Sequence, residues 1–375
     1  MNIGIITIHK INNYGSVFQA YALQQACELF GHHVEIIDYR FPNSYQSNVG
    51  VKSAPVKITF KDKLIKLFYA FALLKQHKGI ASFVKSFQHL SRREYVSPED
   101  LENNAPIYDV YLTGSDQLWN PNYCCGDPSF FLKFVSSGKC KVAYAASFGV
   151  ASISKEFVSK FKEYLMEYES IGVRENTGVK LIEQLTGRKD ARVVLDPTLL
   201  LDKHSWNKIA VQSRIIKEKY ILCYFLNYSF DSFPYVDELA SHIQKITGYK
   251  LVKVARPPRN FYESNTYHCV GASPEEFLAL MRDAEFVITT SFHGTAFAVN
   301  FEIPFSSVVA DKTSGDSRQI SLLDNVGLSK RIIEMGDNFP NLDYLKCDFT
   351  ESSKKMEELR NQSINFLKTS IENGI

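Results

Sequence analysis

The stretch AEFVITTSFHGTAFAVNFEIPF (residues 284–305) contains an apolar run, a short polar turn and a run of small and apolar residues. We predict a strand at 286–289, a turn at 290–294 and a helix after the turn. Open α/β sheets bind ligands where a strand ends and a helix begins, and the N-terminus of a helix favours anions. His293 in this turn is suited to proton transfer near neutral pH. The stretch therefore predicts a parallel α/β sheet with an anion site beside a proton donor.

Strands and helices alternate along the rest of the chain in two series. The first series has predicted strands at 1–8, 33–40, 107–114, 141–147, 169–174 and 191–197, and helices at 16–30, 154–167 and 175–185. The second series has predicted strands at 219–226, 249–254, 286–289 and 303–310, and helices at 232–247, 273–283 and 317–327. Such alternation predicts parallel sheets covered by helices.

The length of 375 residues exceeds that of one ordinary core, so we expect two domains. We predict two Rossmann-like parallel-sheet domains of the α/β class that face a cleft, at residues 1–205 and 215–345. A terminal amphipathic helix should follow at 350–372.

The bulk composition is that of a globular protein, with 45% hydrophobic and 22% charged residues. A net charge of +2 gives no case for binding to nucleic acid. The seven cysteines include no CxxC pair, so we expect a reduced, cytoplasmic location without a disulfide or zinc framework. Because residues 1–8 are predicted to form a strand, we expect no signal peptide there. No apolar run approaches membrane-spanning length.

A basic segment at 52–93 differs from the rest of the chain, because it holds ten lysines and arginines and a single acid, Asp62. The apolar run LIKLFYAFALL lies inside it. A basic amphipathic helix can lie on an anionic membrane surface, which would make the protein peripheral at the inner face of the membrane. Alternatively, a helical basic insertion at 52–100 packs its apolar side on its own domain and leaves the lysines in water.

Two arginines are candidate anion ligands. Arg174 ends the predicted strand at 169–174, and its planar guanidinium suits phosphate or carboxylate, although an ion pair with Glu175 is the alternative. Arg318 begins a predicted helix after a loop that contains glycine, where the helix dipole disfavours a cation. An anionic ligand would offset that cost, and a plain surface position is the alternative.

The first loop after a strand contains Asn12, Asn13 and Tyr14 and lacks the GxGxxG pattern of dinucleotide sites. Amides and a phenol suit sugar hydroxyls, whereas a simple turn capped by Ser16 is the alternative.

Two further strand ends carry acids. Ser115 and Asp116 follow the strand at 107–114, and Asp116 could orient or deprotonate a hydroxyl or could cap the next turn. Asp196 ends the strand at 191–197, where we favour a turn.

With these residues in view, the chain resembles the polysaccharide pyruvyl transferase family. The fragments NNYGSVFQAYALQ, TGSDQLWNP, KVAYAASFG, VRENTG, VLDPTLLL and TTSFHG occur in the family's order and cover most of the chain. The resemblance implies two Rossmann-like domains arranged as in GT-B glycosyltransferases, with the acceptor on the first and the donor on the second. It also implies phosphoenolpyruvate as donor and a pair of glycan hydroxyls as acceptor. We expect the acceptor sugar to belong to a capsule, exopolysaccharide or cell-wall repeat unit, and the basic segment at 52–93 favours a lipid-linked precursor. The product is a pyruvate ketal, and phosphate is released.

The resemblance and the residue chemistry together assign roles. We predict catalytic roles for His293 and Asp116, and no metal or cofactor besides the co-substrate. Donor-binding residues are predicted to be Arg174, Ser291, Phe292, Gly294 and Arg318. Acceptor-binding residues are predicted to be Asn12, Asn13, Tyr14 and Ser115. Because Arg174 and His293 belong to different predicted sheets, the site should lie between the domains.

Two alternatives remain open. A nucleotide-sugar glycosyltransferase of GT-B type would need a carboxylate for the ribose, and Glu302 and Asp311 are the nearby candidates. A glycan-binding or assembly protein without activity could keep the same fold.

Overall fold

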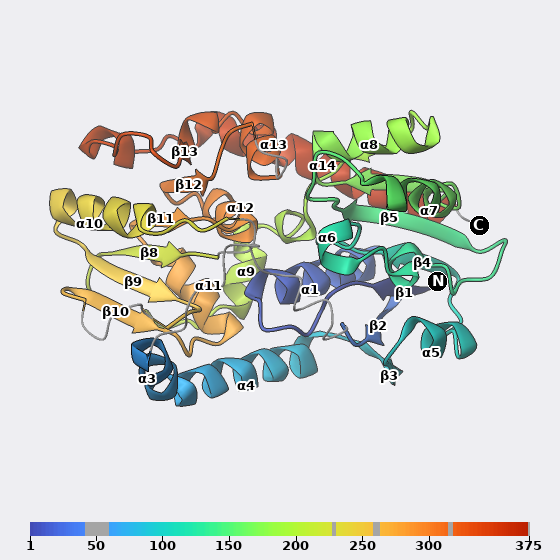
Figure 1. Ribbon diagram of the computed structural model, residues 1–375, viewed down its shortest axis with the longest axis horizontal. Helices are drawn as coiled ribbons and strands as arrows, with labels where there is room; N and C mark the ends of the chain where they lie inside the picture. The colour runs from blue at the N-terminus through green and yellow to red at the C-terminus, as the bar shows by residue number, and fades with distance from the viewer. Residues whose placement is uncertain (42–59, 227–229, 258–262, 314–317, 374–375) are drawn as a thin grey trace.

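A computed structural model describes residues 1–41, 60–226, 230–257, 263–313 and 318–373, so residues 52–59 of the basic segment lie outside the described residues. Two parallel sheets, each formed by one half of the chain, lie beside one another with helices on both faces (Figure 1). This arrangement confirms the predicted fold class.

The first sheet has the strand order β3-β2-β1-β4-β5-β6-β7. Its strands are β1 (Asn2–Ile6), β2 (His33–Tyr39), β3 (Leu90–Tyr95), β4 (Val110–Thr113), β5 (Cys140–Ala146), β6 (Ser170–Val173) and β7 (Arg192–Val193). The helices of this half are α1 (Tyr14–Leu29), α3 (Phe60–Phe68), α4 (Ala70–Phe87), α5 (Pro98–Asn103), α6 (Pro121–Cys124), α7 (Lys155–Leu165), α8 (Asn176–Thr186) and α9 (Lys203–Ile209).

The second sheet has the strand order β10-β9-β8-β11-β12-β13. Its strands are β8 (Tyr220–Tyr224), β9 (Lys250–Val254), β10 (Thr266–Cys269), β11 (Phe286–Thr289), β12 (Phe305–Val309) and β13 (Ile332–Glu334). The helices of this half are α10 (Tyr235–Thr247), α11 (Pro274–Arg282), α12 (Phe292–Asn300), α13 (Arg318–Asn325) and α14 (Thr350–Glu372).

The central strands are the ones that the sequence predicts best. Every residue of β4, β5, β8, β11 and β12 is buried, as expected for parallel strands covered on both faces. The edge strands β3, β10 and β13 were not predicted, because they are short or polar and lack a continuous apolar run. In particular, residues 90–95 form a strand of the first sheet, so the basic segment is helical only in part.

The two halves share one hydrophobic core. Phe18 of α1 packs with Trp206 of α9 and with Phe277 and Phe297 of the second half. The terminal helix α14 also returns to the first half (Figure 1), where Ser363 Oγ accepts a hydrogen bond from Leu195 N at 3.0 Å. The predicted domain boundaries stay a prediction, and the stretch at 205–215 lies between the last strand of one sheet and the first strand of the other.

None of the helices in the described ranges combines the length and the apolar character that crossing a bilayer requires.

Candidate active site

His293 lies in the first turn of α12, directly after the carboxyl end of β11. Ser291 is the N-cap of this helix, and its Oγ accepts a hydrogen bond from Gly294 N at 3.3 Å. The imidazole reaches the other half of the protein, because its Nε2 lies 3.7 Å from Asp196 Oδ2. Its Nδ1 lies against Gly15 in the first turn of α1, where a Cβ atom would be only 2.1 Å away. The ring is therefore enclosed between the two sheets.

Arg174 and two aspartates form a buried charge cluster at the carboxyl edge of the first sheet. Arg174 Nη1 donates to Asp196 Oδ2 at 3.0 Å, and its Nη2 lies 3.5 Å from Asp116 Oδ1. Ser115 Oγ donates to Asp196 at 2.7 Å, and Ser16 Oγ donates to Asp116 at 2.6 Å. The loops after several parallel strands meet here because those strands end at the same edge of the sheet.

The cluster keeps both carboxylates ionised. Burial by itself would raise the pKa of Asp196, but the neighbouring His293 and Arg174 more than offset burial and lower it. The pKa of Asp116 is likewise lowered, since Arg174 and then His293 outweigh the effect of burial.

Asp116 also has an unusual backbone. Its φ is +86°, a left-handed conformation that non-glycine residues rarely adopt and that is common at functional sites.

Several buried polar atoms of the cluster make no hydrogen bond within the described part of the chain. They are Nε and Nη2 of Arg174 and Nε2 of His293. Leaving a buried polar atom without a hydrogen bond costs free energy. Of these two residues, His293 lines the cavity described next, so a ligand there can complete its hydrogen bonds.

A small cavity of about 60 Å³ opens beside His293. Its described wall comes from both halves: Asn13, Asp116, Gln117, Leu226, Phe230, Thr290, Ser291, Phe292, His293, Arg318 and Gln319. A second small cavity shares Asn13 and Leu226 with the first and extends toward Gln76 of α4. The enclosed space fits a small ligand group, since one water fills roughly 10–15 Å³ of such a volume.

Phe292 lies next to both candidate anion-binding arginines. The guanidinium carbons of Arg174 and Arg318 lie 5.0 and 5.9 Å from the centre of its ring. Arg318 lines the cavity, and the amide oxygen of Gln117, in the orientation that satisfies its neighbours, accepts from both of its terminal nitrogens at 3.1 and 3.2 Å. Arg174 does not line the cavity, and its side chain is 1% exposed.

Among the described residues, Arg174 forms no ion pair with Glu175, the alternative partner considered from the sequence. Glu175 instead accepts hydrogen bonds from Ser147 Oγ and Phe148 N, both at 3.0 Å, and burial raises its pKa. Arg174 therefore pairs with acids from other strand ends and holds the cluster together.

Three of the residues predicted to bind ligands make close contacts within the protein, and their predicted roles stay predictions. Ser115 is fully buried and donates to Asp196. Gly294 has no room for a side chain, because a Cβ atom would lie 2.3 Å from Thr289 Oγ1, and its N–H is already capped. Tyr14 donates to Ala272 O at 2.6 Å, which joins the two halves, and it also lines the second cavity.

Asn12 and Asn13 remain at the cavities. Asn13 caps α1, with its side chain accepting from Gly15 N at 2.9 Å, and Asn12 Nδ2 donates to Gln76 Oε1 at 3.2 Å. Ser291 and Phe292 also lie on the cavity wall, and donor binding by them stays a prediction.

Asp196 is the main residue that the sequence interpretation missed, because we favoured a turn at that position. It does cap a short helical turn, with Oδ1 accepting from Thr198 N at 3.0 Å, while Oδ2 faces Arg174 and His293. The sequence did contain a signal for Asp196. It follows a predicted strand, as Asp116 does, and strands of a parallel sheet end at the same edge.

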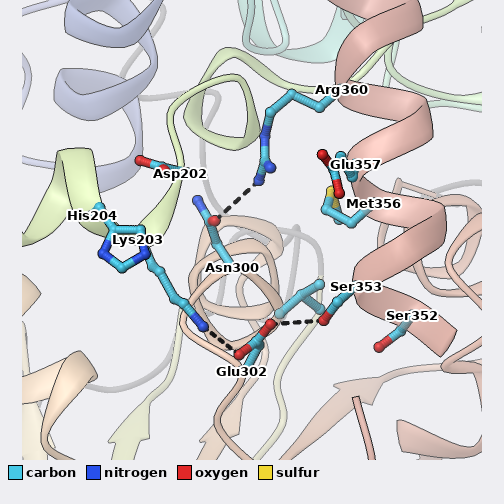
Figure 2. A pocket seen from close by; sticks show the side chains of 11 residues that line it. Asp202, Lys203, His204, Asn300, Glu302, Ser352, Ser353, Met356, Glu357 and Arg360 are labelled. Carbon is cyan, nitrogen blue, oxygen red and sulfur yellow. Dashed lines mark hydrogen bonds and ion pairs between the residues drawn. The ribbon is translucent and has the colours of Figure 1, made fainter. Parts of the chain in front are cut away.

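A larger cavity of about 210 Å³ lies at the other end of α12 (Figure 2). Lys203 of α9 pairs with Glu302, and Glu302 accepts from Ser353 Oγ of α14 at 2.7 Å. Arg360 donates to Leu199 O at 2.7 Å and to Asn300 Oδ1 at 3.3 Å. Glu302 thus lies in this second junction and does not line the cavity beside His293.

Asp311, the other candidate carboxylate for a ribose, accepts hydrogen bonds from N and Oγ1 of Thr313 and lies outside the wall of the His293 cavity. Within the described ranges, no group of three or more His, Cys, Asp or Glu residues is arranged to hold a metal ion.

Two parallel-sheet α/β halves with a polar cluster between them define a GT-B-like protein. The chain belongs to the polysaccharide pyruvyl transferase family, whose family model matches residues 13–311. None of the curated proteins matches the sequence significantly.

Solved structures with similar folds have low sequence identity. The UDP-N-acetylglucosamine 2-epimerase from Rickettsia bellii aligns with a TM-score of 0.53 and 10% identity, over 99% of this chain and 97% of its own. UGT89C1 from Arabidopsis thaliana, complexed with UDP-L-rhamnose, aligns with a TM-score of 0.50 and 12% identity, over 100% of this chain and 98% of its own. At these identities the likeness shows the fold alone.

Proposed function

We propose that this protein is a ketal-forming pyruvyl transferase that uses phosphoenolpyruvate as donor and works in the cytoplasm. The acceptor is a pair of hydroxyls on a sugar of a surface polysaccharide or its lipid-linked precursor. One observation carries the proposal: His293 from one half lies beside Asp196 of the other half, which pairs with Arg174, and the cationic Arg318 lines the same cavity as His293. Family membership supports the same reaction class.

The reaction needs one proton donor and a site for anions. Protonation of the methylene carbon of the donor gives a methyl group and an oxocarbenium-like centre at the adjacent carbon. One sugar hydroxyl adds there and loses its proton, and the carbon–oxygen bond to phosphate breaks with its electron pair leaving on phosphate. The second hydroxyl then closes the ketal ring. The two hydroxyl protons balance the proton delivered to carbon and the one taken by phosphate.

The described residues supply these functions in our proposal. His293 delivers the proton, and the ionised Asp196 stabilises the imidazolium and orients its ring. Arg318, Ser291 and the first turn of α12 provide positive potential for the phosphate and carboxylate of the donor.

Asp116, which lines the cavity, has a different role in the proposal. Because its pKa is lowered, Asp116 is a weak base and is better suited to orienting an acceptor hydroxyl than to deprotonating it. Asn12 and Asn13 offer amide groups to the same sugar.

The test is phosphate release from phosphoenolpyruvate in the presence of candidate galactosides and N-acetylhexosamines. We expect His293→Ala to abolish release while the circular dichroism spectrum stays unchanged. His204→Ala is the matched control, since His204 lines the cavity at the other end of α12, and it should retain activity. Unchanged turnover in His293→Ala would reject His293 as the acid.

The two other functions give different outcomes. A nucleotide-sugar transferase would be stabilised against thermal unfolding by UDP or GDP and not by phosphoenolpyruvate. A glycan-binding protein would bind sugar tightly without releasing phosphate from any donor.

A further inference from the structure

The helices α3 and α4 expose an unusual amount of apolar surface. In Figure 1 they lie along the lower edge of the molecule. Six large apolar side chains in these two helices are between 41% and 83% exposed: Phe60, Leu64, Leu67, Phe68, Phe71 and Leu74. A cluster of this kind on the surface of a protein marks an interaction site.

The inner side of α4 packs against the hydrophobic core. Ile80, Phe83 and Val84 are buried, and Phe83 packs with its ring edge against Phe18 of α1. The first part of α4 lies so close to the second half that a Cβ at Gly271 would be 2.9 Å from the carbonyl oxygen of Ala72. The apolar residues on the outer side are therefore additional to the core.

Cations lie among the exposed apolar residues. Phe71, Leu74, Lys78 and Lys85 follow one another at intervals of three, four and seven residues, which places them along one side of α4. Lys78 and Lys85 are exposed, and among the described residues no carboxylate pairs with either of them. By contrast, Lys75 pairs with Glu276 across the junction of the two halves, with 3.1 Å between Nζ and Oε1.

We propose that the outer surface of α3 and α4, defined by Phe60, Leu64, Leu67, Phe68, Phe71, Leu74, Lys78 and Lys85, docks on an anionic lipid bilayer. Apolar side chains next to unpaired lysines match the boundary between acyl chains and negatively charged headgroups. A second protein with an apolar face would leave the lysines without partners.

The docked orientation has a consequence for the acceptor, and this consequence rests on the proposed function. The opposite side of α4 carries Gln76 and Ile80, which line the small cavity beside Asn12 and Asn13. One helix with its side chains is about 10–12 Å across. A sugar acceptor anchored in the bilayer would thus be held close to the cavity that we assign to it.

The test is flotation of the purified full chain with vesicles, which does not depend on activity. The protein should float at low salt with vesicles of phosphatidylcholine and phosphatidylglycerol, and not with phosphatidylcholine alone. The double variant Phe71→Ser and Leu74→Ser should lose flotation. The control pair Leu29→Ser and Ile107→Ser changes residues that are 78% and 85% exposed elsewhere on the protein and should float like the wild type.

A second pair of variants tests the charges. Lys78→Gln with Lys85→Gln should reduce the vesicle-bound fraction by roughly tenfold or more. Lys180→Gln with Lys189→Gln removes the same charge from α8 and the loop after it and should have little effect.

Two results would overturn the proposal. One is the absence of flotation with anionic vesicles at low salt. The other is a wild-type dimer in light scattering that the Phe71→Ser and Leu74→Ser variant converts to a monomer, because the surface would then bind a second copy of the chain.

Discussion

The two ends of α12 lie at two junctions between the same halves of the protein, and they use similar residues differently. At its C-terminal end, Lys203 pairs with Glu302 and Arg360 donates to Asn300 (Figure 2). Arg360 also donates to Leu199 O. At its N-terminal end, Arg174 and His293 retain nitrogen atoms without hydrogen bonds inside the described structure. The polar groups at the C-terminal junction pair with one another, whereas the N-terminal junction keeps buried nitrogen atoms without hydrogen bonds beside a cavity, which is where our proposal places the ligand.

The dipole of α12 accounts for part of this difference. Cations are favoured near the C-terminus of a helix, where Lys203 and Arg360 lie, and anions are favoured near the N-terminus. The free N-terminal end is the end that suits a phosphorylated donor.

The largest loss of activity should come from a substitution that fills the space occupied by the His293 ring. A Cβ atom in Gly15→Ala would lie 2.1 Å from Nδ1, so the imidazole must move. Alanine suits the helical backbone at this position, and the fold should survive. A displaced catalytic group can cost roughly a hundredfold in rate, so we expect a loss of this order in phosphate release with an unchanged circular dichroism spectrum. Full activity would show that the position of His293 against α1 is unimportant.

The next effect concerns the buried cluster. Asp196→Asn removes a charge that pairs with Arg174 and contacts His293, and we expect it to lower the free energy of unfolding by roughly 3 kcal/mol. Because the pKa of Asp196 is lowered in the folded state, the carboxylate stabilises the fold above its unfolded pKa of about 4. That contribution is lost as the pH falls further.

Urea unfolding of the wild type and Asp196→Asn across a pH series checks this prediction. The difference in the free energy of unfolding should be largest near neutral pH and should shrink below about pH 4. A difference that does not change with pH would mean that the ionised carboxylate is not its source.

A smaller effect on the kinetics should differ between substitutions of the two arginines. Arg318→Lys should raise KM for phosphoenolpyruvate by roughly tenfold, because a charge-assisted hydrogen bond to the donor is lost. Arg174→Lys should lower kcat more than it raises KM, because Arg174 lies behind the cavity and holds Asp116 and Asp196. Steady-state kinetics of phosphate release distinguish the two, and a KM effect in Arg174→Lys alone would reverse the assignment.

The smallest effect is expected at the other end of α12. Glu302→Gln breaks the ion pair with Lys203. Because the side chains of Glu302 and Lys203 are 36% and 37% exposed, the free energy of unfolding should change by about 1 kcal/mol or less. Phosphate release should stay at the wild-type level. A large loss of activity would contradict our view that this junction is structural.

The sequence predicts the central part of the fold because its signals are local. Continuous apolar strands such as β11 and the Ser291 cap identify the strand-to-helix turn and place His293 on it. The edge strand β3 could not be predicted, since its LSRREY sequence is polar and its pairing with β2 depends on tertiary structure.

The candidate site shows the same limit. The sequence singles out His293, Arg174 and Asp116 because each follows a strand end, and the structure brings the three side chains into one cluster. It could not show that Asp196 joins Arg174 to His293, nor that Arg174 is covered by Phe292, because these contacts bring together segments that are far apart in the chain.

Calorimetric titration of phosphoenolpyruvate into the wild type, Arg318→Met and Glu302→Gln tests directly whether the donor binds beside His293. The variants Arg318→Met and Glu302→Gln compare the N-terminal and C-terminal ends of α12. We predict that the wild type and Glu302→Gln bind equally and that Arg318→Met binds at least tenfold more weakly. No binding to the wild type, or a loss in Glu302→Gln with none in Arg318→Met, would contradict the placement of the donor beside His293.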